Sequence, residues 1–401
     1  MRISTASHPA LGRAVGKARG WGRGWVWTDV VVPVVVVRLA LLLAGWFSQV
    51  VMPNPHYPAA EALARGWHFS QSRLLDVWAR WDTGWYLAIV VAGYPEGPLE
   101  ANAQSRFAFF PLYPLVVRLF TLLLPERLRS AERILIVGLL LSQVFLVAAL
   151  ILLHKLVSAM TDREAARRAV LYTLLFPTGF FLFCFYTESI FLLLAVGAFY
   201  AASRGAWGVA CLLGGLLSLA RPPGVLIGVP LLWMYLESIG WSPTRLRPDV
   251  LWFALIPAGL LSFLLYARRM TGDFLAPVRA QSGWQKTLTA PWATFLYPTG
   301  GDPYVTAVEQ VLTVLFVALS VWSLFKLPSA GYGIYALLLI IPPLTSGTLL
   351  STSRYYLVVF PAFVVLALLG RRPFVDDIIK IIFFGLQIAF MVAWSSLYWV
   401  A

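Results

Sequence analysis

Long apolar runs constrain this chain more than any other feature of its sequence. They recur from Val30 to Val400, and several reach eighteen residues or more, which is enough for a helix to cross about 30 Å of hydrocarbon. Apolar residues make up 60% of the 401 residues and charged residues only 12%, whereas a soluble domain is about 45–50% apolar and about 25% charged. The sequence therefore predicts an all-α polytopic membrane protein and excludes a soluble enzyme, a secreted disulfide scaffold and a disordered tail.

The basic charge of the chain fits the same class. Lys and Arg number 31 against 18 Asp and Glu, a net charge of +13, which in a soluble domain would suggest a nucleic-acid partner. Here the basic residues cluster between apolar runs, so we expect them to contact lipid headgroups and to set topology, with no nucleic acid bound. Cys184 and Cys211 lie inside apolar runs and are expected as buried residues rather than a disulfide. The excess of Arg over Lys favours a bacterial source.

The distribution of charge predicts an order of segments along the chain. The apolar run 30–51 is too long for the core of a signal peptide and lacks a clear cleavage site, so we expect it to be retained. The expected segments are a basic cytoplasmic N-terminus (1–29), a first transmembrane helix (30–51), a first external loop with surface helices (52–133), a transmembrane bundle (134–268), a second external loop (269–304) and C-terminal transmembrane helices (305–401).

Whether one segment crosses the membrane decides on which side of it every later loop lies. Residues 107–124 are apolar but are broken by Pro111 and Pro114 and carry Arg118. If this segment lies along the outer surface, the short basic loops that follow fall on the inside, as the positive-inside rule requires. We therefore expect about eleven transmembrane helices, with both long polar stretches outside.

The first candidate for chemistry is Asp82, within Trp78-Ala79-Arg80-Trp81-Asp82-Thr83-Gly84-Trp85-Tyr86. The three tryptophans have the spacing i, i+3, i+7, which predicts one aromatic face of a helix in the headgroup layer. A carboxylate held at the membrane surface can act as a general base, and partial desolvation would make it a stronger one. The structural alternative is an interfacial helix in which Asp82 pairs with Arg80 or Asp76.

Two further candidates lie beside prolines or between apolar runs. Tyr113 lies in Phe109-Phe110-Pro111-Leu112-Tyr113-Pro114, where two prolines break a helix and the phenol could contact a polar ligand; the alternative is a kinked surface helix. Glu188 lies between two apolar runs, and a carboxylate at membrane depth usually faces a polar cavity or a partner. Its expected counterpart is Arg221, and the alternative is a structural ion pair that joins two hairpins.

The last candidate is Arg354, within Ser351-Thr352-Ser353-Arg354-Tyr355-Tyr356. An arginine flanked by hydroxyls at the outer start of a helix offers bidentate donors to a phosphate, whereas a snorkelling arginine is the alternative. The four histidines are scattered, and no phosphate-binding loop, dinucleotide fingerprint or D-x-D motif occurs. We therefore expect neither a bound metal nor another cofactor.

In this order the motifs resemble those of the PIG-V (GPI mannosyltransferase II)-like family. The matching residues are Arg80-Trp81-Asp82-x-x-Trp85-Tyr86 with Gly93-Tyr94, then residues 109–114, Phe176-Pro177, Tyr186-Thr187-Glu188-Ser189, Arg221-Pro222 and Arg354-Tyr355. The resemblance covers roughly residues 30–370. It implies a GT-C glycosyltransferase, a multispan enzyme whose large first external loop carries the catalytic Asp. Such enzymes take a sugar, usually mannose, from a polyprenyl phosphate on the external or lumenal face.

The resemblance implies a role for each candidate residue. Asp82 is the expected general base of an inverting transfer, and Arg221 and Arg354 are expected to bind the donor phosphate. Glu188 would orient the acceptor or an arginine. The remaining substrate-binding candidates are Arg80, Trp81, Trp85, Tyr86, Tyr113 and Tyr355. The expected partners are membrane lipids, a polyprenyl-phosphate sugar and a lipid or glycolipid acceptor.

Two other functions remain open at this point. The same charges could line the path of a transporter or flippase for a lipid-linked sugar, although the sequence shows none of the repeated halves typical of transporters. The chain could also be a non-catalytic scaffold subunit, and an accessory membrane subunit could assemble with it. For a bacterial chain the expected location is the plasma membrane with the site outside, and for a eukaryotic chain the ER membrane with the site in the lumen.

Overall fold

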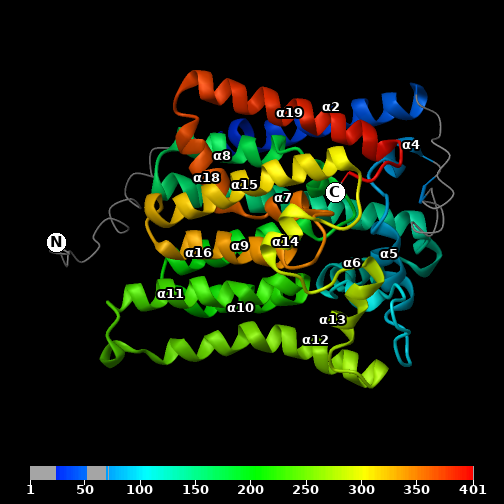
Figure 1. Cartoon of the computed structure of the whole chain (residues 1–401), viewed down its shortest axis with the longest axis horizontal. Coiled ribbons are helices and arrows are strands. Elements are labelled where there is room, and N and C mark those ends of the chain that lie inside the picture. The colour runs from blue at the N-terminus through cyan, green and yellow to red at the C-terminus, as the bar shows by residue number, and fades with distance from the viewer. Residues whose placement is uncertain (1–23, 52–68, 71, 401) are drawn as a thin grey trace.

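The described part of the chain is entirely helical. The computed structural model describes residues 24–51, 69–70 and 72–400, and these residues form helices and turns without a strand. Most helices run roughly parallel to one another in a single bundle (Figure 1). Among the described residues five helices are long and apolar enough to cross a membrane, and several shorter apolar helices pack with them. The chain is thus a polytopic integral membrane protein, as the sequence predicts.

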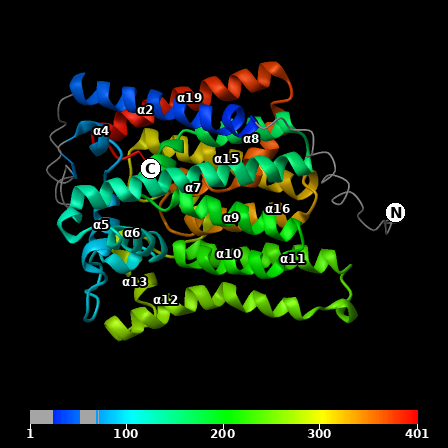
Figure 2. The ribbon, with the colours of Figure 1, turned by 180° about the vertical axis from the view of Figure 1, so that it is seen from behind.

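The long helices form the outer part of the bundle. They are the joined η2 and α2 (Trp27–Val51), α7 (Ala131–Met160), the joined η8 and α12 (Pro248–Thr271), α15 (Pro303–Lys326) and α19 (Pro373–Ser395). In both views α2 and α19 lie together along one edge and α12 lies along the opposite edge (Figures 1 and 2). All of these helices except α7 keep several large apolar side chains exposed, and α7 exposes Leu140 and Val144, as is expected of surfaces that face lipid.

Shorter helices fill the interior between the long ones. They are α8 (Arg163–Leu175), α9 (Glu188–Ser203), α10 (Trp207–Ala220), α11 (Gly228–Ser238), α16 (Ala330–Leu344) and α18 (Phe360–Leu369). Prolines explain why apolar runs are broken, because a proline lacks the N–H that continues a helix. Within the apolar run 169–186, α8 ends before Pro177, and the chain continues as the 3-10 turn η5 (Gly179–Phe183). Pro222 begins the 3-10 turn η6 (Pro222–Ile227), which separates α10 from α11.

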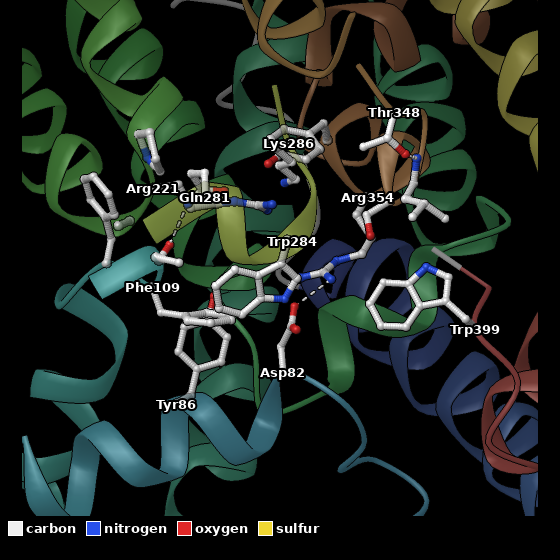
Figure 3. Close-up of a pocket in the computed structure, with 17 residues that line it drawn as sticks. Asp82, Tyr86, Phe109, Arg221, Gln281, Trp284, Lys286, Thr348, Arg354 and Trp399 are labelled. Carbon is white, nitrogen blue, oxygen red and sulfur yellow. Dashed lines mark hydrogen bonds and ion pairs between the residues drawn. The ribbon is translucent and has the colours of Figure 1, made fainter. Parts of the chain in front are cut away.

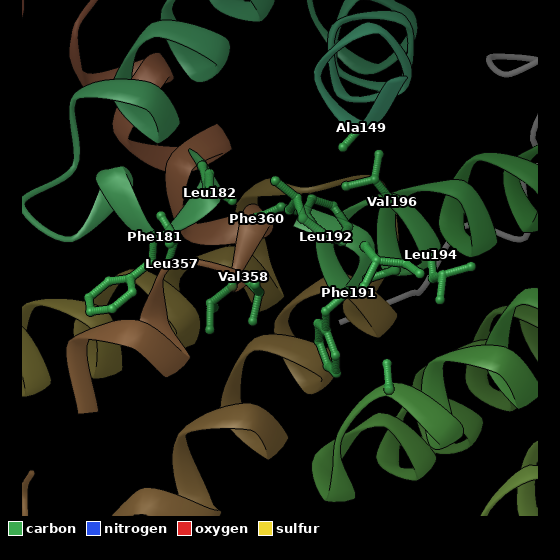
Figure 4. Packing of buried hydrophobic residues seen from close by; sticks show 14 of the residues in the cluster. Ala149, Phe181, Leu182, Phe191, Leu192, Leu194, Val196, Leu357, Val358 and Phe360 are labelled. Carbon is green, nitrogen blue, oxygen red and sulfur yellow. The ribbon is translucent and has the colours of Figure 1, made fainter. Parts of the chain in front are cut away.

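The core is packed where α7, α9, η5 and the segment leading into α18 meet. Figure 4 shows Ala149, Leu182, Val196 and Phe360 among the side chains that converge there, all with almost no exposed surface. Cys184 and Cys211 are free and buried, which confirms that they are apolar packing residues rather than a disulfide.

Both polar stretches of the sequence contribute to the same end of the bundle. That end contains α4 (Arg73–Asp76), α5 (Thr83–Ala92), α6 (Leu112–Leu122), α13 (Ala276–Arg279) and the 3-10 turn η9 (Ala280–Trp284), on the right in Figure 1. The helix α6 has 11 residues and is therefore about 16 Å long, too short to cross a bilayer. That residues 107–124 lie along the membrane surface stays a prediction.

The prediction of one continuous aromatic helix around Asp82 is wrong. α4 ends at Asp76 and α5 begins at Thr83, and between them Trp81 has a φ of 49°, which a continuing right-handed helix does not allow. Trp78, Trp81 and Trp85 are buried in the bundle instead of lying at its surface. Trp78, for example, packs against Phe183 at a ring distance of 5.8 Å.

Candidate active site

Asp82 lies at the start of α5, where the chain turns from an irregular segment into a helix. Its backbone N–H donates a hydrogen bond of 3.0 Å to the Tyr186 hydroxyl, and that hydroxyl donates one of 2.9 Å to the carbonyl oxygen of Arg80. The Asp82 side chain makes no capping bond to α5, so its carboxylate is free to point away from the helix. Tyr186 thus fixes the turn that aims the Asp82 carboxylate into a pocket (Figure 3).

Arg354 is the cation that faces Asp82. It lies on the short helix α17 (Thr352–Tyr356), and its Nη1 donates to Asp82 Oδ2 at 2.8 Å. Nε and Nη2 of the same guanidinium both lie 3.1 Å from Glu188 Oε1. Burial would lower the pKa of Arg354, but the carboxylates of Glu188 and Asp82 outweigh that effect and raise the pKa well above its ordinary value. Arg354 is therefore a permanent cation that bridges the two carboxylates.

Glu188 is the second carboxylate of the site and is completely buried. It is the first residue of α9, where the helix dipole favours a negative charge. Its Oε1 also accepts a hydrogen bond of 3.1 Å from Arg221 Nη1, so the expected pairing of Glu188 with Arg221 is present and Arg354 joins it. Arg221 lies between α10 and η6, and its guanidinium carbon is 4.6 Å from the centre of the Tyr355 ring.

The pocket beside this network contains part of the expected set of residues. Asp82, Tyr86, Arg221, Arg354 and Tyr355 all line it. The other lining residues that carry polar or large aromatic groups were not predicted as site residues from the sequence; they are Phe109, Phe110, Gln281, Trp284, Lys286, Thr348, Ser351 and Trp399. Figure 3 shows Trp284 and Trp399 on opposite sides of Asp82. Two aromatic walls with a carboxylate and several cations between them suit a ligand that has both a ring and a negative charge.

The other expected residues do not line the pocket. Arg80 is buried in an ion pair of 2.6 Å with Asp76, and the Tyr113 hydroxyl donates to the carbonyl oxygen of Gly138 at 3.0 Å. Trp81 lies behind the pocket wall with its ring 5.0 Å from that of Trp399. Arg80 and Tyr113 thus have internal partners in this structure, and their expected contact with substrate stays a prediction.

Trp85 and Glu188 also lie outside the pocket but act on its lining. Trp85 stacks on Phe109 at 5.7 Å and meets Trp284 edge-on at 5.4 Å, so it supports an aromatic wall. Glu188 lies behind Arg221 and Arg354 and holds both through its Oε1.

Lys286 brings a third cation to the pocket from the second polar stretch. Its Nζ is 5.8 Å from the centre of the Tyr355 ring. This positive charge is the main cause that lowers the pKa of Tyr355 to about 8; burial opposes it, and Arg221 and Arg354 add to it. No motif in the sequence marks Lys286 as a site residue. The only signal is the number of membrane crossings, which places both polar stretches, the second of which contains Lys286, on one side of the membrane.

No group of three or more metal-binding side chains comes together within the ranges 24–51, 69–70 and 72–400. The two carboxylates of the pocket network are paired with arginines. The arrangement offers a base in Asp82, anion binding by the cations and a ring-binding surface on the tryptophans.

Solved structures share the helical fold of this chain. The apo oligosaccharyltransferase of Archaeoglobus fulgidus is 14% identical, with a TM-score of 0.51, and the match covers 94% of this chain and 57% of that one. The match to ArnT from Cupriavidus metallidurans, solved bound to undecaprenyl phosphate, has 16% identity, a TM-score of 0.46 and covers 83% of this chain and 59% of that one. This chain thus spans under two-thirds of their length, and the likeness to the oligosaccharyltransferase shows a GT-C fold.

The sequence also matches a protein family over a stretch that contains part of the site. No curated protein sequence matches it significantly. The model of the family described as mannosyltransferase (PIG-V) matches residues 29–270, more than half of the 401 residues, and the matched stretch contains Asp82, Glu188 and Arg221. The resemblance noted from the motifs is thereby confirmed, and the chain belongs to the PIG-V mannosyltransferase family of membrane glycosyltransferases.

Proposed function

We propose that this protein is an inverting mannosyltransferase that moves mannose from a polyprenyl phosphate to a hydroxyl of a lipid or glycolipid acceptor. The observation that carries the proposal is the contact between Asp82 and Arg354 in a pocket that also contains Arg221. A base and cations side by side are what a transfer from a phosphate leaving group needs. The membership of the PIG-V family supports mannose as the sugar.

Asp82 is the base of the proposed reaction. Its Oδ2 is bound by Arg354, while its Oδ1 makes no hydrogen bond within the described part of the chain and can accept the proton of the acceptor hydroxyl. The acceptor oxygen attacks C1 of mannose from the face opposite the phosphate, and the C1–O bond to the phosphate breaks. The electron pair of that bond passes to the phosphate oxygen, where cations of the pocket such as Arg221 stabilise the charge.

Three of the residues assist without taking part in bond making. Glu188 orients Arg221 and Arg354 through its Oε1. Tyr86 and Tyr355 line the pocket and contact the substrate, and no metal or other cofactor has a step in this mechanism.

We also propose that the pocket opens on the external face of the membrane. The pocket lies at the end of the bundle that contains α5 and η9, whereas basic turns such as that at Arg204 lie between helices at the other end. Positive charge marks the cytoplasmic side of a membrane protein. In a bacterial cell the site would face outward from the plasma membrane, and in a eukaryotic cell it would face the ER lumen.

Donor turnover in detergent tests this function. The purified full chain is incubated with a panel of polyprenyl-phosphate sugars and a membrane lipid extract, and loss of each donor and release of polyprenyl phosphate are followed. We expect polyprenyl-phosphate mannose to be consumed and a mannosylated lipid to form. A flippase or a scaffold subunit gives no product in detergent, so an intact panel after incubation with well-folded protein would reject the proposal.

A further inference from the structure

The charges in and behind the pocket do not balance. Two carboxylates, Asp82 and Glu188, are in direct ion pairs with two arginines, Arg221 and Arg354. Lys286 also lines the pocket, where it has a side-chain hydrogen bond with Tyr355, and within residues 72–400 no carboxylate lies in ion-pair distance of it. Counting formal charges, two negative groups face three positive ones, so these side chains have a surplus of one positive charge.

The surplus charge is directed into the pocket. Figure 3 shows the Lys286 ammonium pointing toward the same space as Arg221 and Gln281. Lys286 is only partly exposed, and an ammonium removed from water without a counter-ion is unfavourable. The low pKa of Tyr355, about 8, reports the same positive potential from a neighbouring group. Both features indicate that the natural occupant of this part of the pocket is an anion.

Arg354 is poorly placed to receive that anion. All three nitrogens of its guanidinium already face carboxylate oxygens of Asp82 or Glu188 at 2.8–3.1 Å. Turning Arg354 toward a phosphate would release Asp82, whose orientation the reaction needs. Arg221, in contrast, uses only Nη1 for Glu188 and has no other hydrogen-bonded nitrogen among the described residues, so two of its nitrogens remain available.

We propose that Lys286, with Arg221, is the contact for the phosphate of the lipid-linked donor, and that Arg354 instead positions Asp82. This inference rests on the proposed function. It assigns phosphate binding to Lys286 and Arg221 and the positioning of the base to Arg354. When the bond between C1 and the phosphate oxygen breaks, the electron pair stays on that oxygen and the phosphate gains one negative charge. The ammonium of Lys286, which has no carboxylate partner among residues 72–400, balances the gained charge, while the carboxylates keep their arginines.

Binding of the lipid phosphate measures the role of Lys286 without any need for the acceptor. The purified full chain in detergent is titrated with undecaprenyl phosphate and, separately, with undecaprenol, which has the same chain and no phosphate. The variants are K286M, K286R and the control K326M, which removes an exposed lysine at the far end of α15. Thermal unfolding of each variant shows whether it is folded.

We expect the wild type to prefer undecaprenyl phosphate over undecaprenol and K286M to lose about tenfold or more of its affinity for the phosphate, in line with the strength of charge-assisted hydrogen bonds. K286R should recover most of the affinity because it keeps the charge, and K326M should bind as the wild type does. Affinity for undecaprenol should be the same in all four proteins.

The pH dependence of binding gives an independent readout. The charged groups that face the Tyr355 phenol are Lys286, Arg221 and Arg354. A bound phosphate offsets their field and raises the pKa of Tyr355, so the protonated phenol is the form that favours binding. Affinity is therefore full between about pH 7, above which the phosphate monoester is mostly dianionic, and pH 8, and it falls as the pH rises from 8 to 9. In Y355F, which cannot ionise, we expect no such fall.

Each possible failure has its own meaning. If folded K286M binds undecaprenyl phosphate as tightly as the wild type, Lys286 is not the phosphate contact and the inference is wrong, while the proposed function stands. If the wild type itself binds undecaprenol as tightly as undecaprenyl phosphate, the site does not recognise a polyprenyl phosphate, and both the inference and the proposed donor are wrong.

Discussion

At the scale of single residues, Arg80 shows that a charge next to the proposed base can serve the fold alone. Its Nη1 donates to Asp76 Oδ2 and to the Asp76 carbonyl oxygen, both at 2.6 Å. Asp76 Oδ1 in turn accepts the backbone N–H groups of Phe69 and Ser70. The pair is buried and ties together the segment that leads to Asp82.

We predict that R80M destabilises the protein instead of weakening its contact with substrate. Removing one partner of a buried ion pair leaves an uncompensated charge, which costs about 3–5 kcal/mol. The free energy of unfolding of R80M should fall by that amount, and the control R73M, which removes an exposed arginine, should change little. A stable R80M with a raised KM for the donor would instead restore Arg80 as a substrate contact.

The residues of the site could be predicted one by one, but their pairing could not. Asp82, Glu188, Arg221 and Arg354 stand out because a charge near the end of an apolar run is costly unless it has a function. The sequence left Asp82 open to pairing with Arg80 or Asp76. The actual partner, Arg354, is 272 residues away, and only the packing of α17 against α15 and α16 brings it there.

At the scale of helices, α15 fixes the short helix that carries Arg354. The buried carboxylate of Glu309 accepts two hydrogen bonds of 2.7 Å from Ser353, one from its backbone N–H and one from its hydroxyl. Thr178 donates to the carbonyl oxygen of Ser353 at 3.1 Å. Ser353 is thus held from two sides, and the orientation of the next residue, Arg354, depends on it.

We predict that E309A slows transfer while leaving the donor phosphate contact intact. Arg354 would lose its fixed orientation toward Asp82, and small misplacements at a reacting centre cost up to about 10²-fold. The value of kcat should fall at least tenfold, while affinity for undecaprenyl phosphate stays close to that of the wild type. E237A, which changes a carboxylate on α11 that bonds Trp233 and Ser329, is the control. Equal losses of kcat and of phosphate affinity would contradict a positioning role for Glu309.

The helices themselves were predictable where apolar runs are long, and less so where tertiary contacts decide. The run 305–325 corresponds to α15 (Pro303–Lys326) almost residue by residue. The spacing of Trp78, Trp81 and Trp85 predicted a surface helix, but the Asp76–Arg80 pair and the turn at Trp81 end that pattern. Burial of the three indoles in the bundle outweighs their fit to the headgroup layer.

At the scale of the whole molecule, polarity divides the bundle into two ends. The segments around α5 and η9 gather at one end with the pocket (Figure 1). Basic turns such as the one at Arg204 lie between helices at the opposite end. This division is predictable from the sequence because the length of the apolar runs and the positions of positive charge determine it. How far Lys286 reaches into the pocket could not be predicted.

We predict that the pocket end faces the outside of the cell. Because Cys184 and Cys211 are buried and free, the wild-type chain should give little background with a membrane-impermeant maleimide. E100C, in the first polar stretch, should be labelled in intact cells, whereas T244C, in a turn at the other end, should be labelled only after the membrane is opened. Both positions are exposed, so the reverse pattern would mean that the orientation is inverted.

The role of Asp82 as the base is tested most directly by measuring mannose transfer by D82N. The amide keeps the size of the carboxylate but cannot take the proton of the acceptor, and loss of a general base costs about 10²–10⁴-fold in rate. With polyprenyl-phosphate mannose and a membrane lipid extract in detergent, we expect D82N to lose transfer by that factor. Its stability and its affinity for undecaprenyl phosphate should be retained, and D273N, which alters a carboxylate near α13, should transfer normally. Transfer by folded D82N at close to the wild-type rate would contradict the account.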